Sequence, residues 1–361
     1  GGRGMLDDGG FGVSSPLYAA LRWLEYACML ALVGAVVLVR VIAPRAAGQR
    51  AAFVQRVGRG AGRVLGVAAA ALALATVLRL VAQVAALKGG DASVVIDVPA
   101  LVMHTMWGWS WLLELAGVAL AAAAVLPPPR AQRARWRVAT IGVAALAVSF
   151  ALGGHAVGVT RLRVLTVVCD ALHVLGAGGW LGTLLVVAVV AIPAALAEAP
   201  NERGRAVADV VNAFSPVALF CAAVVLATGV VAAWMHLGAL AALWQSDYGR
   251  TLLIKLALVA TVAALGAINW RILRPALGTE QAAVRIQRSA AMELVVGAAV
   301  LVATAVLVAA SPPMEMKSGM AGPHQAPAAF SVPDAASAVA GPPSHSVGMT
   351  MRVRVPRTDG T

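Results

Sequence analysis

Charged residues are scarce in this chain. Asp, Glu, Lys and Arg together make up 12% of its 361 residues, which is about half the share found in a typical soluble domain. A chain with so little charge is solvated only if lipid covers most of its surface, so an ordinary soluble globule is excluded. Aromatic residues are also few, at 5%, and therefore offer no stacking platform for single-stranded nucleic acid.

Other absences narrow the range of functions further. The sequence has no GxxxxGK[ST] phosphate-binding motif, so we do not expect this chain to pump ions with ATP. Its three cysteines are widely separated, which excludes a disulfide framework and a CxxC site. They are Cys28, Cys169 and Cys221, and we expect them to be buried thiols.

Apolar residues, by contrast, make up 60% of the chain, and its mean hydropathy is +0.85. A helix needs about 20 apolar residues to cross a bilayer core about 30 Å thick. Runs of that length occur at 17–39, 64–87, 101–126, 136–159, 164–192, 207–234, 251–273 and 290–310. We therefore predict an all-α polytopic membrane protein, not an enzyme, whose eight transmembrane helices form a bundle surrounded by membrane lipid.

The two ends of the chain differ in composition from this membrane region. Residues 1–16 form a polar, glycine-rich stub, and residues 17–310 hold the predicted helices. In residues 311–361 the apolar periodicity stops, and Pro, Ala, Gly, Ser and Met predominate. Such a composition cannot bury enough surface to fold, so we predict a flexible tail.

The formal net charge of +12 would suggest nucleic-acid binding in a soluble protein, but here the basic residues stand in short loops between apolar runs. Loops after the first, third, fifth and seventh runs are rich in arginine, whereas the alternate loops hold only Lys88, Arg161, Arg163 and Arg250. Positively charged loops stay in the cytoplasm. We predict a multi-pass protein of the cytoplasmic membrane, with both termini outside and no nucleic-acid partner.

This topology sorts the six histidines. His104, His155, His173 and His236 fall in the outer half of the membrane region, and His324 and His345 fall in the tail. His173 is the deepest, roughly 14 Å below the start of its helix at a rise of 1.5 Å per residue. Ionisable groups at such depth are costly and usually functional, which favours a metal site over interfacial side chains.

The segment around His173 carries the densest group of polar residues. Asp170 and Cys169 precede His173 by three and four residues, so all of them share one helix face. A carboxylate beside an imidazole orients the ring and raises its basicity, and we expect Asp170 to do this for His173. The glycines that follow are predicted to let another helix approach closely; they are Gly176, Gly178, Gly179 and Gly182.

Charged residues also stand inside other apolar runs. Glu25, Arg79 and Lys255 lie in the predicted outer half, where they form either an internal ion-pair network or side chains that reach the headgroups. Glu114 lies nearer the middle of its run, and is a candidate for ion or proton passage.

Methionines accompany the histidines on the predicted outer side. The tail carries Met314, Met316, Met320 and His324 within a short stretch, and Met235 stands directly before His236. Thioether sulfur suits Cu(I), and imidazole suits copper in either valence. Accidental low complexity is the alternative for the tail alone, but together with the intramembrane histidines the pattern points to copper ions, as Cu(I) or Cu(II).

Several stretches resemble the copper-resistance D family of bacterial inner-membrane proteins. They are GGHA at 153–156, DALHVLGAGGWLGTLL at 170–185, FSPVAL at 214–219, ATGVV at 227–231, YGRTLLIKL at 248–256, NWRILRP at 269–275 and MEL at 292–294. The resemblance implies copper movement across the bacterial cytoplasmic membrane, generally uptake, with a periplasmic copper-binding protein or domain as partner. His155 and His173 lie in matching motifs and inherit the expectation of copper ligands, while Gly182 and Thr183 replace the usual Gly-Gly pair.

We therefore predict a copper transporter that takes up copper at its outer face. The predicted metal site comprises His104, His155, His173, His236, Asp170, Met235, Met314, Met316, Met320 and His324. One alternative is a b-type haem electron-transfer protein, because paired histidines on neighbouring helices also hold haem. Another is an assembly factor that delivers copper to a membrane oxidase without transporting it.

Overall fold

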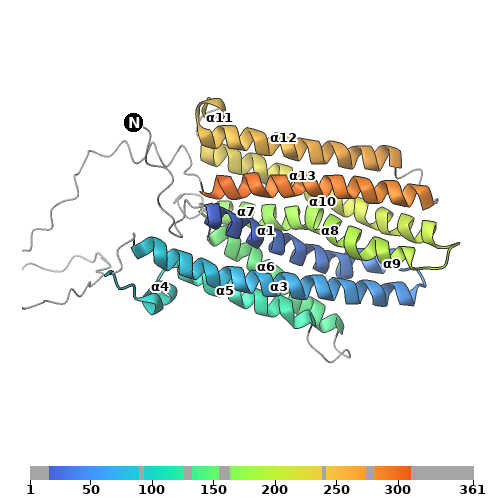
Figure 1. Ribbon diagram of the computed structural model, residues 1–361, viewed down its shortest axis with the longest axis horizontal. Coiled ribbons are helices and arrows are strands. Elements are labelled where there is room, and N and C mark those ends of the chain that lie inside the picture. Colours follow the sequence, from blue (N-terminus) through green and yellow to red (C-terminus); the bar gives the residue numbers. More distant parts are fainter. Residues whose placement is uncertain are drawn as a thin grey trace, which may run out of the picture. The chain divides into compact units, whose positions relative to one another are not determined.

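The computed structural model describes residues 16–88, 93–125, 132–153, 163–237, 241–273 and 280–309. Within these ranges the chain forms helices and no strand. Eight of the helical segments in this part are long and apolar enough to cross a membrane, which confirms the predicted all-α class and the predicted number of spans. Figure 1 shows the long helices lying side by side in one bundle.

The first span is made of consecutive helical pieces. Helix α1 (Pro16–Val37) passes through a π-helical turn, η1 (Leu38–Ile42), into α2 (Ala43–Ala46). A short turn follows, in which Gly48 has a φ of 51°. A positive φ of this kind costs glycine nothing, so the chain can reverse here and enter the second span.

The second span, α3 (Ala51–Lys88), is longer than the apolar run 64–87 that predicted it. Its first part carries several arginines, which interrupt the run in the sequence. The helix extends there because residues four apart form a buried stripe against the rest of the bundle. That stripe comprises Phe53, Val57, Ala61 and Leu65.

The third predicted segment, 101–126, is broken near its start. A short helix, α4 (Val98–His104), ends at Thr105, whose backbone is extended, and α5 (Met106–Ala122) begins there. The Thr105 hydroxyl caps α5 by accepting a hydrogen bond from the Gly108 amide at 3.0 Å. A β-carbon on Gly108 would come within 2.2 Å of the Val102 carbonyl oxygen, so glycine allows α4 to fold back onto α5.

The end of α5 tightens into a 3-10 turn, η2 (Ala123–Val125), and the fourth span is α6 (Gln132–Leu152). The predicted continuation of that span to residue 159 lies outside the described residues. Helices α5 and α6 approach closely through Gly117 and Gly142, because a β-carbon on Gly142 would lie 2.6 Å from the Gly117 carbonyl oxygen. Small residues at such crossings are typical of membrane helices.

The fifth span consists of helical segments joined by two π-helical turns, η5 (Gly178–Gly182) and η6 (Val187–Ala191). The α-helical parts are α7 (Arg163–Ala177), α8 (Thr183–Val186) and α9 (Ile192–Leu196). Helix α1 packs directly on η5, since a β-carbon on Gly182 would lie 1.9 Å from the Leu30 carbonyl oxygen. The predicted role of the glycines after His173 in close helix packing is thereby confirmed.

The remaining spans are α10, α12 and α13. Together with the short helix α11 and the π-helical turn η7, these elements are α10 (Arg203–Leu237), α11 (Ala242–Gln245), α12 (Asp247–Ile268), η7 (Asn269–Leu273) and α13 (Glu280–Ala309). Large apolar side chains on α10 and α12 face outward, among them Phe220, Trp234 and Ile254. Such surfaces suit a protein surrounded by lipid.

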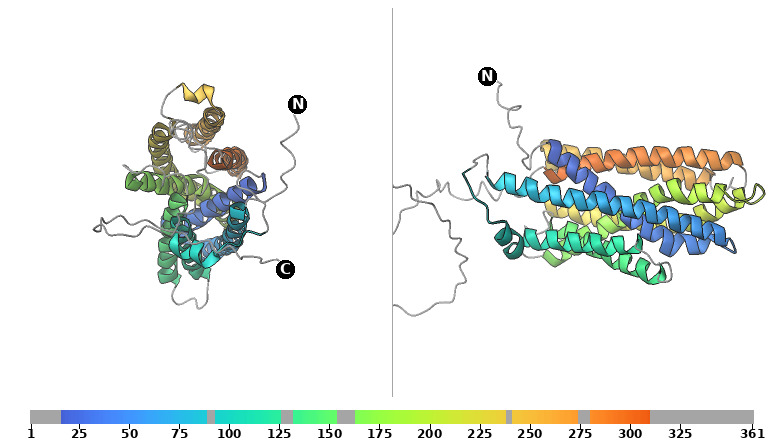
Figure 2. Two further views of the ribbon diagram at one scale, coloured as in Figure 1. Left: turned by 90° about the vertical axis from the view of Figure 1, so that its left-hand side faces the viewer. Right: turned by 60° about the horizontal axis from the view of Figure 1, so that its bottom comes forward.

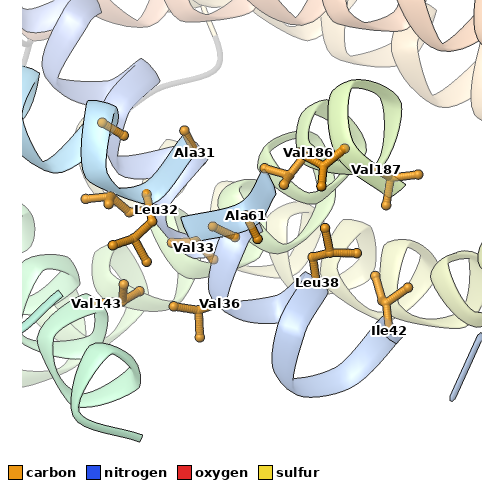
Figure 3. Packing of buried hydrophobic residues seen from close by; sticks show 14 of the residues in the cluster. Ala31, Leu32, Val33, Val36, Leu38, Ile42, Ala61, Val143, Val186 and Val187 are labelled. Carbon is orange, nitrogen blue, oxygen red and sulfur yellow. The ribbon is translucent and has the colours of Figure 1, made fainter. Parts of the chain in front are cut away.

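Helix α1 lies at the centre of the described bundle. It contacts α3, α6, η5 and α13, and the end-on view in Figure 2 shows it between these segments. The close view in Figure 3 shows Val36 of α1 near Val143 of α6, and Leu38, at the end of this span, near Val186 of α8; Leu32 of α1 and Ala61 of α3 belong to the same cluster. The first span is thus the central element on which the other helices assemble.

Ion pairs join several helix ends at one end of the bundle. Arg50, just before α3, pairs with Asp209 of α10, and Arg56 of α3 pairs with Glu198, just after α9. Figure 1 shows the start of α3, the end of α9 and the start of α10 at this same end. We call it the arginine-rich end, and we call the opposite end, where α7 and α12 begin, the histidine end.

Candidate functional site

His173 is the predicted copper ligand that the structure describes most fully. It lies on α7, half-buried, and its Nδ1 atom is 2.9 Å from the Oγ1 atom of Thr228 on α10. The Thr228 hydroxyl donates its single proton to the Val224 carbonyl oxygen at 2.7 Å, so towards His173 it can only accept. This hydrogen-bond network assigns the proton to Nδ1 and leaves the lone pair of Nε2 free to bind a metal.

Two charged residues lie in the neighbourhood of His173. Asp170 precedes it by one turn on α7, and Lys255 lies on α12. Lys255 is near enough to both Asp170 and His173 to interact with them electrostatically. Because Thr228 occupies Nδ1, the predicted role of Asp170 in orienting the His173 ring stays a prediction.

Met235 lies at the histidine end of α10, and its Sδ atom is 3.7 Å from the Oγ1 atom of Thr166. Thr166 belongs to α7, one turn before Asp170. The thioether of Met235 therefore lies on the same side of α7 as the hydrogen-bonded pair His173 and Thr228, nearer the histidine end. We call Thr166, Asp170, His173, Thr228, Met235 and Lys255 the histidine cluster.

The other predicted ligands fall into two groups. His104 is exposed and ends α4, which packs against α5. His236 belongs to α10, but its side chain lies outside the described part of the structure, as do His155, Met314, Met316, Met320 and His324. Within the described ranges, no group of three or more His, Cys, Asp or Glu side chains is placed to hold a metal ion.

The cysteines are not part of a thiolate site in the described residues. Cys28 is buried, whereas Cys169 and Cys221 are half-buried, and all are free thiols. The prediction of buried thiols is therefore correct for Cys28 and too strong for the other two. The Sγ atom of Cys221 packs against η5, where a β-carbon on Gly179 would come within 2.5 Å of it.

A buried network of charges joins α1, α3 and α5. Glu114 of α5 accepts hydrogen bonds from Arg79 Nη2 at 2.5 Å and from Thr76 Oγ1 at 2.7 Å. Glu25 of α1 pairs with Arg22, and its Oε1 atom lies 3.6 Å from Arg79 Nε. These four ionic side chains are at most 3% exposed, so the predicted internal ion-pair network is confirmed for Glu25 and Arg79, and Lys255 is not part of it. Glu114, predicted as a candidate for ion or proton passage, belongs to the same network through its pair with Arg79.

Arg22 of this network was not among the residues predicted from the sequence. It lies three residues before Glu25, a spacing that places both on one helix face, and this could have identified it. The guanidinium carbon of Arg22 is 5.0 Å from the centre of the Tyr26 ring and 5.7 Å from that of Phe150. We call Arg22, Glu25, Arg79 and Glu114, which carry two charges of each sign, the buried charge network.

A second polar group lies on η7 and α13, and the sequence reasoning did not single it out as a site. The side-chain amide of Asn269 donates to Glu293 Oε1. Ser289 Oγ donates to Asn269 Oδ1 at 2.6 Å. Glu293 is only 4% exposed, and its position after Met292 in the MEL stretch was the available signal. We call these side chains the Glu293 group.

Comparison with known proteins gives matches over most of the chain. The model of the family "Copper resistance protein D" matches residues 208–307, and that of "Copper resistance protein D-like, N-terminal domain" matches residues 5–162. A copper transport protein, CutJ of Bacillus subtilis (strain 168), is 28% identical over 262 residues, which cover 70% of this chain and 46% of that protein. The chain thus spans about half the length of this curated relative. No solved structure matches.

Proposed function

Because the chain belongs to the copper resistance protein D family, we propose that it transports copper across the bacterial cytoplasmic membrane, as a transporter and not as an enzyme. We further propose that copper enters at the histidine end and binds Nε2 of His173. The observation that carries this proposal is the hydrogen bond from His173 Nδ1 to Thr228, because it leaves the second ring nitrogen free inside a membrane span.

Further ligands come from the same end of the bundle in this proposal. Met235 and Asp170 belong to the histidine cluster, and thioether and carboxylate groups extend the donor set beyond imidazole. His104, His155 and His236 complete the entrance, and Met314, Met316, Met320 and His324 of the tail capture copper and raise its local concentration. Sulfur donors favour Cu(I), whereas imidazole accepts either valence.

The proposed topology follows from the distribution of basic residues between the two ends of the bundle. Arg50 and Arg56, with the start of α10, occupy the arginine-rich end, and basic loops stay in the cytoplasm. The histidine end then faces the periplasm, and both chain termini lie outside. A periplasmic copper-binding protein or domain is the partner that this orientation suits.

The first test is elemental analysis for copper and iron on protein purified in detergent, after copper loading and removal of loosely bound metal. We expect stoichiometric copper without iron. Stoichiometric iron would instead indicate that the histidines hold haem b, and would overturn the copper assignment.

The second test compares His173→Ala with His345→Ala in copper-uptake assays on cells. We expect the His173 variant to lose uptake, because it removes the membrane-embedded ligand, and the His345 variant to retain it. Equal uptake by the two variants would refute the assignment of His173. Cells that accumulate no copper with the unaltered protein, although the purified protein binds copper, would point to a copper-delivery factor.

A further inference from the structure

One face of α12 connects the histidine cluster to the Glu293 group. Its residues recur every three or four positions, which places them on a single helix face. On α12 they are Lys255, Leu258, Val259, Val262 and Gly266, and the face continues at Asn269, the first residue of η7. Val262 stands seven residues from both Lys255 and Asn269, which is about 10 Å in each direction at 1.5 Å per residue.

The middle of this face is closed by an apolar cluster. Trp180 of η5, Val262 of α12 and Val300 of α13 are each at most 9% exposed and pack together. Leu258, Val259 and Val296 pack against them. Apolar constrictions of this kind gate ion paths by excluding water, and π-helical turns such as η5 are frequent at functional sites.

The Glu293 group lies beyond this apolar cluster, towards the arginine-rich end. Oε1 of Glu293 accepts a hydrogen bond from Asn269, which Ser289 in turn holds in place. Oε2 lies on the side of Gly266, where a β-carbon would come within 3.8 Å of it. The missing side chain of Gly266 therefore leaves room beside this oxygen.

Glu293 differs from the other buried acids in its charge balance. Glu25 and Glu114 each pair with an arginine inside the bundle. No described lysine, arginine or histidine lies within 4.0 Å of the Glu293 carboxylate. A buried carboxylate without a cation is costly, so this position favours a positive ion arriving from elsewhere.

We propose that α7, α10, α12 and α13 enclose the path of the transported copper ion, that Trp180 closes this path, and that Glu293 is a second, inner binding site on it. The inference rests on the proposed function, because a path requires transport. A single carboxylate that is hydrogen-bonded to a side-chain amide is a weak copper site compared with a site of imidazole and thioether donors. Weak binding suits an exit, because an ion must also leave.

The test uses the full chain in liposomes of phosphatidylethanolamine and phosphatidylglycerol that enclose a copper-sensitive dye. Copper ions alone are added outside, and Glu293→Gln is compared with the matched control Glu202→Gln, whose carboxylate is exposed between α9 and α10. We expect Glu293→Gln to lower copper flux at least about tenfold, and Glu202→Gln to leave it unchanged. Copper that stays on the detergent-purified protein after loosely bound metal is removed is measured in parallel. It reports the tighter site at His173 and not the weak site at Glu293, so this tightly held copper should be the same in both variants.

Substitution of Trp180 provides an independent test of the proposed path. Trp180→Ala opens the apolar cluster and should raise copper flux, whereas Trp180→Phe keeps a large ring there and should change it little. Wild-type flux in Glu293→Gln would overturn the inner site while leaving the proposed function standing. If Glu293→Gln fails to accumulate, unchanged flux in Trp180→Ala overturns the path. Absence of copper flux in the unaltered protein would overturn the proposed function and this inference together.

Discussion

The Nδ1 atom of His173 on α7 lies 2.9 Å from the Oγ1 atom of Thr228 on α10. This contact ties the fifth span to the sixth, and it determines which ring nitrogen remains free. Because the Thr228 hydroxyl already donates to Val224, the orientation of His173 depends on a side chain that is itself held by its own helix. For the copper site proposed above, this means that His173 is already oriented before the metal arrives.

Thr228→Val tests this contact. Valine keeps the shape of threonine but removes the hydroxyl, so the His173 ring loses its fixed orientation and tautomer. Loss of such a supporting hydrogen bond typically weakens metal affinity by about 10-fold to 100-fold, and we expect a decrease in that range in a copper titration of purified protein.

Thr228→Ser is the matched variant for this titration, because serine keeps the hydroxyl. It should retain affinity close to that of the unaltered protein. If the valine and serine variants bind copper equally well, the contact has no part in positioning the ligand.

The close packing of α1 on η5 predicts a strong effect of Gly182→Ala. A β-carbon at that position would lie 1.9 Å from the backbone carbonyl oxygen of Leu30, and a backbone atom cannot move aside as a flexible side chain can. Overpacking of this kind typically costs about 1–3 kcal/mol. We expect a lower apparent melting temperature in detergent.

Gly62→Ala is the control, because its β-carbon would meet only Val125 Cγ1, at 3.7 Å. Alanine in the interior of α3 should stabilise the helix by up to about 1 kcal/mol. A Gly182→Ala protein as stable as Gly62→Ala would contradict the observed crossing of α1 and η5.

The buried charge network predicts that removal of both partners of a pair costs less than the two single removals added together. Glu114→Ala leaves Arg79 without the carboxylate that lies 2.5 Å from its Nη2 atom, and breaking a buried pair from one side costs about 3–5 kcal/mol. The double variant Arg79→Ala with Glu114→Ala removes the uncompensated charge. Its destabilisation in detergent unfolding experiments should be smaller than the sum of the single effects.

A strictly additive result would indicate that Arg79 and Glu114 do not interact energetically. In that case the passage of an ion or proton at Glu114 would again be the better explanation of a buried acid in α5.

The number of spans was predictable from sequence because it depends on the length of apolar runs alone. The break at Thr105 was not, because it depends on a cap to Gly108 and on contact between α4 and α5. The extension of α3 was hidden by arginines whose neighbours form a buried stripe. Such features arise from tertiary packing, which local composition does not report.

The candidate site likewise has one part that the sequence predicts and one part that only the structure shows. The depth of His173 in its helix was visible in the sequence, but its partner Thr228 lies on another span, 55 residues away. Glu293 and Asn269 are 24 residues apart, and only the packing of η7 on α13 brings them together. Helical periodicity relates residues within one helix, and the partners in these two pairs lie on different helical segments. The sequence alone could therefore not pair them.

The proposed orientation of the protein in the membrane predicts which introduced cysteines are accessible from outside the cell. Val95 lies between α3 and α4 and is 91% exposed, whereas Glu202 is exposed between α9 and α10. In intact cells, a thiol reagent that does not cross membranes should label Val95→Cys and leave Glu202→Cys unlabelled, because the proposed orientation places the arginine-rich end in the cytoplasm. The unaltered chain, with Cys28, Cys169 and Cys221 all inside spans, measures the background. Permeabilised cells should label both variants, which shows that Glu202→Cys is reactive. Labelling of Glu202→Cys alone in intact cells would reverse the orientation and would place the histidine cluster at the cytoplasmic side, where it could serve copper release but not uptake.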